Sequence, residues 1–276
     1  MAKNPTILVA TDLSARCDRA IDRAMVIAES QSARLLIVHV IEKGELGKDL
    51  AYEQDLKAEI ARDFPSATVA VEIIVGRGSV PKEIAEIAER EKCSLIVTGV
   101  ARMNSLRDFI LGTLVSALVR QSAIPVLIVK KRPLRPYQKM LAATDFSSCS
   151  LHALRVAADQ FPELPIQLEH AFQVPYGGIL KSDQVAKDTR AEVNRDMKSF
   201  LKEIGDEDGL LDRLETHIAY GQITSVVSER LSASGTDLFV IGTHGKSGFA
   251  HASIGSIAAD LMSWVPVDTL VVRETR

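Results

Sequence analysis

Short apolar runs alternate with amphipathic segments along the chain, and this alternation predicts strands that alternate with helices. Continuous apolar runs, typical of strands buried on both faces, span 6–10, 35–40, 69–75, 95–98 and 125–129 in the first part of the chain. Apolar residues at helical spacing, such as Ala20, Ala24 and Ala28, predict helices over 14–30, 46–64, 81–90 and 113–120. Ser14 is the expected N-cap of the first helix.

The second part of the chain repeats the first. ILVATDLS at 7–14 returns as MLAATDFS at 140–147, and LIVTG at 95–99 returns as LFVIG at 238–242. Later pairs at 112–113 and 255–256, and at 127–129 and 270–272, keep the same order. Four blocks in one order indicate a tandem duplication with halves at 1–131 and 139–276. The repeat predicts second-half strands over 139–144, 166–171, 215–219, 237–241 and 269–273.

The join between the halves, KKRPLRPYQK at 130–139, is basic and contains two prolines that exclude regular helix. Such a run could bind phosphate. A solvated linker is the favoured interpretation, because the whole chain has a formal charge of only −3.

Alternating buried strands and helices predict a parallel sheet with helices on both faces in each half. Ligands of such sheets bind beyond the carboxyl ends of the strands, where the strand order reverses. The loops after the first and fourth strands of each half are therefore the candidate sites. They begin at Asp12 and Gly99 in the first half, and at Asp145 and Gly242 in the second.

The second-half loop carries the pattern G-x2-G-x9-G-S, formed by Gly242, Gly245, Gly255 and Ser256. Glycines at a strand exit let the backbone adopt positive φ and approach a ligand closely. Backbone amides and the N-terminus of the following helix would then bind an anion, with the Ser256 hydroxyl as a further donor. The pattern is not a Walker A loop, because Val240 stands where that motif needs glycine. A long αβ connection without a ligand is the alternative interpretation.

The composition of the chain narrows the kinds of partner and the cellular compartment that we expect for this protein. Hydrophobic residues make up 46% and charged residues 25%, as in a globular protein, and aromatic residues are scarce at 5%. With a charge near zero, these values disfavour nucleic-acid and membrane partners. We expect neither a secretory signal nor a membrane span, because the apolar run at 6–10 is too short for a signal core and no apolar stretch approaches about 20 residues. Cys17, Cys93 and Cys149 form no disulfide or metal spacing, so we expect reduced thiols in a cytoplasmic protein.

The TDFS sequence around Asp145, together with the long glycine pattern, resembles the universal stress protein family over nearly the whole chain. The resemblance implies two Rossmann-like (HUP-type) α/β domains, each a five-stranded parallel doubly wound sheet of order 3-2-1-4-5, packed as an intramolecular pseudo-dimer. Many members bind ATP. By position, Asp145 and Ala171 would border the adenine and ribose, and Ile241 and Gly242 would line the nucleotide. The residues implied around the phosphates are His244, Gly245, Gly255, Ser256 and Ile257.

The first half departs from this pattern, because Arg102 replaces the second glycine. Its side chain could bind phosphate through the guanidinium or could fill the pocket, and we favour a weakened site there. The residues that would remain are Asp12, Val40, Gly99, Gly112 and Thr113. Asp12 or Asp145 could also help to hold Mg²⁺ beside a phosphate. We interpret His39 and His170, at equivalent strand ends, as buried hydrogen-bonded groups rather than metal ligands.

The leading hypothesis is an ATP-binding regulatory protein of the stress response with its competent site in the second half. One alternative is a slow ATPase, for which the sequence offers no positioned base. The other is a scaffold or chaperone-like protein that binds another metabolite in the first half, where Arg102 and Arg107 are the only support. Because members of the family tend to associate through edge strands, a homodimer would pair at 126–129 or 270–272.

Overall fold

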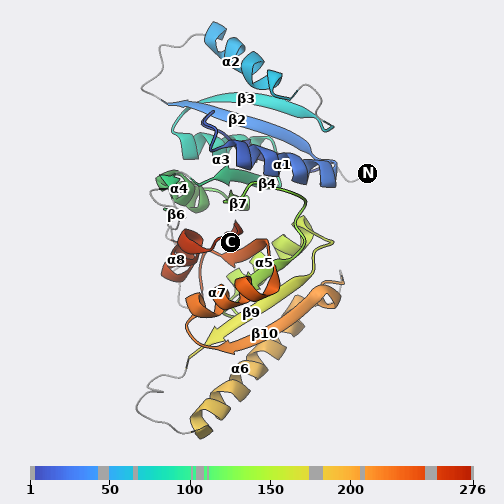
Figure 1. The fold of residues 1–276 in the computed structure, drawn as a ribbon, viewed down its shortest axis with the longest axis vertical. Helices are drawn as coiled ribbons and strands as arrows, with labels where there is room; N and C mark the ends of the chain where they lie inside the picture. Colours follow the sequence, from blue (N-terminus) through green and yellow to red (C-terminus); the bar gives the residue numbers. More distant parts are fainter. Residues whose placement is uncertain are drawn as a thin grey trace.

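Strands and helices alternate along both halves of the chain, as the apolar pattern predicts (Figure 1). The computed structural model describes residues 4–42, 50–64, 68–100, 102–103, 109–110, 112–173, 183–205, 209–245 and 254–274. Within this part of the chain, no helix is both long enough and apolar enough to span a bilayer.

The strands of the main sheet are short and mostly buried. In the first half they are β1 Thr6–Ala10, β2 Arg34–Glu42, β3 Val71–Gly78, β4 Leu95–Gly99 and β7 Val126–Val129. In the second half they are β8 Met140–Ala143, β9 Ile166–Phe172, β10 Leu214–Tyr220, β11 Leu238–Gly242 and β12 Asp268–Val272. A separate hairpin of β5 Arg102–Met103 and β6 Phe109–Ile110, which the apolar pattern did not predict, lies in the glycine-loop region of the first half.

The helices fall close to their predicted positions. The first half contains α1 Asp18–Gln31, α2 Leu50–Arg62, α3 Val80–Arg90 and α4 Thr113–Gln121. The second half contains α5 Ser148–Gln160, α6 Asp183–Ile204, α7 Ile223–Ser234 and α8 Ser256–Trp264, with a 3₁₀ turn at Leu211–Arg213. The prediction of Ser14 as an N-cap is wrong, because α1 begins only at Asp18 after Cys17. Ser147 does cap α5, since its side chain accepts a hydrogen bond from the Ser150 amide.

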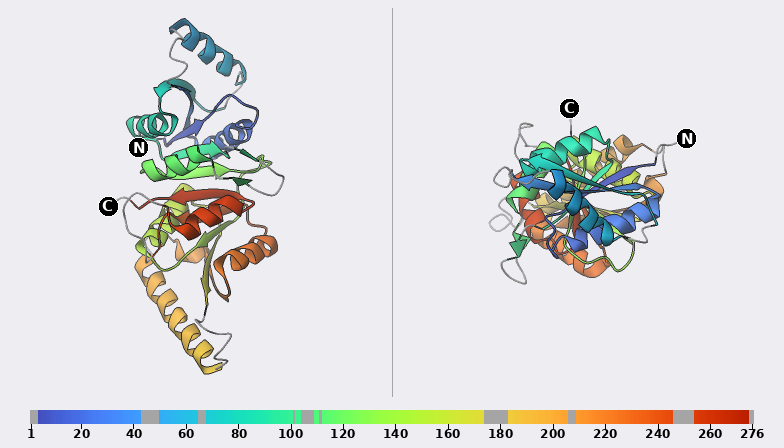
Figure 2. Two further views of the ribbon diagram at one scale, coloured as in Figure 1. Left: turned by 90° about the vertical axis from the view of Figure 1, so that its left-hand side faces the viewer. Right: turned by 90° about the horizontal axis from the view of Figure 1, so that it is seen from above.

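All the strands of both halves outside the hairpin join in one ten-stranded sheet, in the order β10-β9-β8-β11-β12-β7-β4-β1-β2-β3. Counted along each half, the order is the expected 3-2-1-4-5, with parallel pairing. At the centre, β12 and β7 pair antiparallel, with Leu270 opposite Leu127. The sheet runs along the long axis of the molecule, with α2 and α6 toward its two ends (Figures 1 and 2).

Two apolar cores, one on each face of the sheet, continue across the junction of the halves. One core collects residues of α1, α2, α5 and α6, and the other collects residues of α3, α4, α7 and α8. Alternate residues of β7 enter opposite cores, with Leu127 in the first and Ile128 in the second. The chain is therefore the expected pseudo-dimer.

The strands expected to pair with a second copy pair instead with each other. Because β7 and β12 occupy the centre of the sheet, neither presents a free edge. A homodimer formed through these strands is incompatible with this arrangement, and the expectation is corrected accordingly. The outer strands of the sheet are β3 and β10.

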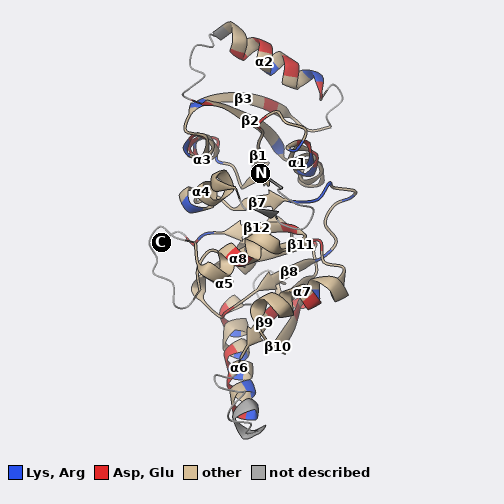
Figure 3. Cartoon of the chain, turned by 60° about the vertical axis from the view of Figure 1, so that its left-hand side comes forward, with Lys and Arg blue, Asp and Glu red and all other residues tan. Residues whose placement is uncertain are grey.

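Charged side chains gather on the helix nearest one end of the molecule. Lys, Arg, Asp and Glu alternate along the exposed part of α6 (Figure 3). The other face of this helix places Val193, Met197, Phe200 and Ile204 against the protein at helical spacing. Helix α6 is thus an amphipathic cover for the sheet.

Candidate functional site

The turn after β8 fixes Asp145 at the carboxyl end of that strand. The Phe146 amide donates to Thr144 Oγ1 at 2.9 Å, and the Ser147 amide donates to Asp145 Oδ1 at 3.1 Å. Phe146 has a φ of 61°, which is unusual for a residue other than glycine. Its ring stacks on His170 with centroids 4.1 Å apart. The local hydrogen bonds and this stacking hold a turn that the backbone alone disfavours.

The first half builds the same turn after β1. Leu13 also has a φ of 61°, its amide donates to Thr11 Oγ1 at 3.0 Å, and the Ser14 amide donates to Asp12 Oδ1 at 2.9 Å. The two strand-end histidines are also equivalent. Nδ1 of His39 lies 3.0 Å from the Thr11 carbonyl, and Nδ1 of His170 lies 2.8 Å from the Thr144 carbonyl. Both rings are half-buried and hydrogen-bonded, so they brace the turn in each half.

Two glycines of the second-half loop lie against the β8–α5 connection. A Cβ atom on Gly245 would lie 2.4 Å from Asp145 Oδ2, and one on Gly242 would lie 2.8 Å from Cys149 Sγ and 3.0 Å from the Cys149 carbonyl oxygen. None of Gly242, Gly245 and Gly255 has positive φ, so the freedom of glycine to adopt positive φ is not used at these positions. Close approach of the two loops is what requires glycine at 242 and 245.

The end of the loop returns to its beginning. The Gly255 amide donates to the Thr243 carbonyl at 2.9 Å, and Gly255 is the N-cap of α8. The Gly255 amide is thus engaged within the protein and is not the free donor that the sequence suggested. No side chain among the described residues caps α8, and the amides of Ser256 and Ile257 at its first turn make no hydrogen bond to another described residue. The Ile257 side chain is 58% exposed there.

The two ring nitrogens of His244, beside this loop, differ in their hydrogen bonding. Its Nδ1 lies 2.8 Å from Thr243 Oγ1, whereas its Nε2 is buried without a hydrogen-bond partner among the residues that the structure describes. Buried polar atoms are rarely left unpaired, so a missing partner at this position is informative. The remainder of the loop, at 246–253, lies outside the described residues.

Ala171 and Ile241 come from the two strands that flank β8. Ala171 lies near the end of β9, beyond the last residue pair of β8 and β9, and Ile241 lies in β11. The chain leaves β8 for β9 on one side and reaches β11 on the other, so the strand order reverses at β8. Crevices at such a reversal are where doubly wound sheets bind ligands.

Gly99, the first-half equivalent of Gly242, has more room around it among the described residues. A Cβ atom on Gly99 would lie 3.7 Å from the nearest described atom, the Arg16 carbonyl oxygen. Arg102 lies in the short strand β5, and its side chain lies outside the described part of the chain. Gly112 is the N-cap of α4, which begins at Thr113. Val40, in β2, corresponds in place to Ala171 in β9.

The electrostatics of the first-half turn are those of a charged carboxylate beside a neutral thiol. Burial acts to raise the pKa of Asp12, but hydrogen bonds from Ser14 and Cys17 outweigh it and hold the pKa below its usual value. Burial raises the pKa of Cys17 to about 11, so this thiol is protonated at neutral pH and is a poor nucleophile. Among the described residues, no three His, Cys, Asp or Glu side chains gather as a metal site would require.

Sequence reasoning missed two residues of the second-half site. The Thr243 hydroxyl hydrogen-bonds the His244 ring, and its carbonyl accepts the Gly255 amide. Its own amide donates to the Val272 carbonyl at 3.0 Å. Cys149, in the first turn of α5, packs directly beneath Gly242. Thr243 occupies a variable position of the glycine pattern, so the pattern gave it no weight, and Cys149 becomes relevant only once α5 is placed beside β11.

Comparisons with known proteins agree on one family. The sequence model of the universal stress protein family matches residues 3–130 and again 136–273. Universal stress protein A homolog 1 of Coxiella burnetii is 31% identical over 136 residues, which are 45% of this chain and 94% of that protein. A universal stress protein of Archaeoglobus fulgidus superposes with a TM-score of 0.69 at 18% identity, over 99% of this chain and all of that one.

A functionally unknown protein of Pseudomonas aeruginosa superposes with a TM-score of 0.68 at 23% identity, over 97% of this chain and 92% of that one. At these identities, both structural likenesses concern the fold alone. The matches to the family model cover both halves, in agreement with the duplicated sheet. The chain therefore belongs to the universal stress protein family.

Proposed function

We propose that this protein binds ATP in its second half and acts as a nucleotide-dependent regulator in the stress response. The observation that carries the proposal is the contact of Gly245 with Asp145, where a Cβ atom would come within 2.4 Å of the carboxylate. This contact brings the glycine loop and the turn after β8 together at the point where the strand order reverses.

The chemistry around this contact suits the parts of a nucleotide. The first-turn amides of Ser256 and Ile257, at the positive end of α8, suit phosphate oxygens. The Asp145 carboxylate suits the hydroxyl groups of a ribose, as acidic side chains do in other doubly wound nucleotide sites. Ala171 is half-buried and offers apolar surface for a base, whereas Ile241 is 6% exposed and belongs to the core. The resemblance to ATP-binding members of the family makes ATP the nucleotide of choice.

Two further groups extend this assignment. His244 Nε2 is buried and lacks a partner among the described residues, and a phosphate oxygen would supply one. Asp145 could also help to hold Mg²⁺ beside the phosphates, because Mg²⁺ commonly keeps several waters and takes few protein ligands.

Calorimetric titration with ATP and Mg²⁺ tests the proposal on three proteins: the wild type, Gly245→Ala and Gly99→Ala. The methyl group of Gly245→Ala would displace the Asp145 carboxylate, so binding should fall at least tenfold, as for other misplaced polar contacts. Gly99→Ala is the matched control, because its methyl group meets no described residue closer than 3.7 Å. It should bind ATP as the wild type does.

Two outcomes would contradict the proposal. The wild type would show no heat of binding at millimolar ATP, or Gly245→Ala would bind as tightly as the wild type. Binding lost on substitution of Arg102 but kept in Gly245→Ala would instead place the nucleotide in the first half.

A further inference from the structure

Lys130, the residue after the last strand of the first half, contacts α8, the last helix of the second half. Lys130 directly follows β7, and its side chain is 2% exposed. Its Nζ donates to the Met262 carbonyl at 2.9 Å and to the Val265 carbonyl at 2.6 Å. These carbonyls belong to the carboxyl-terminal end of α8, where a cation and its N–H donors are favourable. A residue of the first half therefore caps α8.

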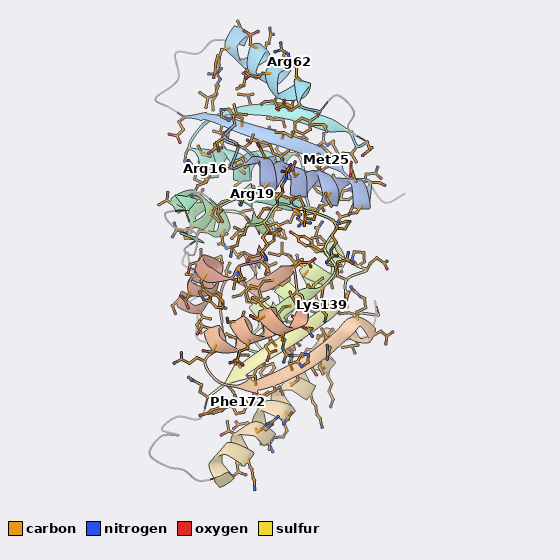
Figure 4. The ribbon with its side chains drawn as sticks, viewed as in Figure 1. Arg16, Arg19, Met25, Arg62, Lys139 and Phe172 are labelled. Atoms are coloured by element: carbon orange, nitrogen blue, oxygen red, sulfur yellow. The ribbon has the colours of Figure 1, made fainter. Side chains whose placement is uncertain are left out.

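The main chain at Lys130 is itself held from the second half. Asp268, the first residue of β12, accepts the amides of Lys130 and Lys131 through Oδ1, at 2.8 and 3.1 Å. Its Oδ2 accepts Arg23 Nε at 3.2 Å and the Tyr137 hydroxyl at 2.7 Å. Arg19 of α1, labelled in Figure 4, donates to the Lys130 carbonyl at 3.4 Å. The cap thus rests on a fixed backbone.

The duplicated fold carries a second, weaker version of the same contact. Arg273 follows β12 as Lys130 follows β7, and its guanidinium donates to the Arg120 carbonyl in the last turn of α4. Arg273 is half-buried, whereas Lys130 is buried and makes two such bonds. The buried, doubly bonded cap serves α8, which follows the intact glycine loop. The more exposed cap serves α4, which follows the loop that carries Arg102.

Because α8 is short, we expect a displacement of one end to move the other end as well. The helix has nine residues, and its N-cap Gly255 is tied to Thr243 at the start of the glycine loop. Strand β6 of the first half also lies against α8 (Figure 1). A short helix packed in this way moves as a rigid body, so the anchor at its carboxyl end sets where its first-turn amides lie.

We propose that Lys130 is a positioning residue for the nucleotide site of the second half, through which the first half controls the affinity of that site. The inference rests on the proposed function, because it takes the first turn of α8 to be the phosphate-binding end. Lys130 does not touch the nucleotide. It holds α8 in the position that presents the amides of Ser256 and Ile257.

The test compares ATP affinity in the wild type, Lys130→Met and Arg273→Met at a temperature where all three are folded by circular dichroism. Lys130→Met keeps the length of the side chain and removes its donors, and should weaken ATP binding roughly tenfold, within the usual range of coupling between sites. Arg273→Met removes the symmetry-equivalent cap and should bind ATP as the wild type does. Equal affinities in Lys130→Met and Arg273→Met would overturn the inference alone. A wild type that binds no ATP would remove the proposed function and this role with it.

Amide hydrogen exchange gives a readout that does not depend on the stability of a variant. In the wild type, ATP should slow exchange at Trp264 and Val265 as well as in the first turn of α8, because the helix is held as one body. Lys130→Met should speed exchange in that first turn while leaving β8 and β11 unchanged. Protection by ATP that stops at the first turn would overturn the inference even if Lys130→Met failed to fold.

Discussion

A buried lysine is the residue that departs most from the hydrophobic pattern of this chain. Lys130 stands in a basic segment that predicts a solvated linker, yet its side chain is 2% exposed. Burial lowers the pKa of its ammonium group to about 7 from an ordinary 10.5, and the Asp268 carboxylate offsets only part of that effect. Its hydrogen bonds survive deprotonation, because a neutral amine still has two N–H groups for the two carbonyls it meets.

This pKa predicts how stability depends on pH. Between pH 7 and 10.5 the unfolded chain holds the Lys130 proton and the folded chain does not, so the free energy of unfolding should rise with pH. The gain from pH 7 to pH 9 should be about 2 kcal/mol and should be absent from Lys130→Met. Urea unfolding followed by the emission of Trp264, the only tryptophan, measures it. Lys131→Met is the control and should keep the gain; an equal gain in Lys130→Met would refute the prediction.

At the scale of elements, two equivalent helices begin differently. Ser147 caps α5, which starts at once after the turn, whereas α1 starts four residues after Ser14. Ser14 caps no helix, and its side chain instead contributes to the lowered pKa of Asp12. The identical TD-x-S sequences gave no sign of this difference, because it depends on how α1 packs rather than on the turn itself.

The matched variants Ser147→Ala and Ser14→Ala test the difference. Loss of the Ser147 cap should lower the free energy of unfolding by about 1 kcal/mol. Ser14→Ala removes a hydroxyl that caps nothing, so its effect should stay within about 0.5 kcal/mol. Equilibrium unfolding in urea compares them, and a loss in Ser14→Ala as large as in Ser147→Ala would show that Ser14 has a capping role after all.

The apolar pattern of the sequence predicted most of the strands and helices, for a clear physical reason. Strands such as β4 and β11 are buried on both faces, so they read as unbroken apolar runs, and the repeat confirmed each by a second copy. The hairpin of β5 and β6 has no such run. Gly245 was singled out for its local backbone freedom, whereas its close approach to Asp145 depends on the packing of two loops.

Long-range contacts explain what the sequence could not give. Tyr137 lies in the basic linker, yet it is 5% exposed, because its hydroxyl bonds Asp268 and its ring packs under Arg23, 4.0 Å from the guanidinium carbon. Those partners lie in different halves of the chain, far from Tyr137 in sequence. No local window contains both, so the linker reads as polar and exposed.

At the scale of the molecule, the halves form one cooperative unit. One sheet and two cores cross the junction, and Asp268 joins Arg23 of the first half to Tyr137 of the linker. Asp268 is 1% exposed and Arg23 is 5% exposed. Removal of one partner would leave the other charge buried without compensation, which is more damaging than loss of an exposed ion pair.

Asp268→Ala should therefore destabilise the protein by roughly 3–5 kcal/mol. In the wild type, circular dichroism and Trp264 emission should report one coincident unfolding transition. Asp237→Ala is the matched control. Asp237 lies immediately before β11, as Asp268 lies at the start of β12, and it accepts amides of the linker at Gln138 and Lys139, but it is only half-buried. Its effect should be about 1 kcal/mol or less. Separate transitions for the two probes in the wild type would show that the halves unfold independently.

The antiparallel meeting of β7 and β12 also fixes where the two loop regions face. All neighbouring strands within each half are parallel. The strands of the two halves therefore run in opposite directions. The loops after β4 and β11 consequently open at opposite rims of the shared sheet. The duplication therefore separates the two loop regions by the length of the strands and does not merge them into one larger site.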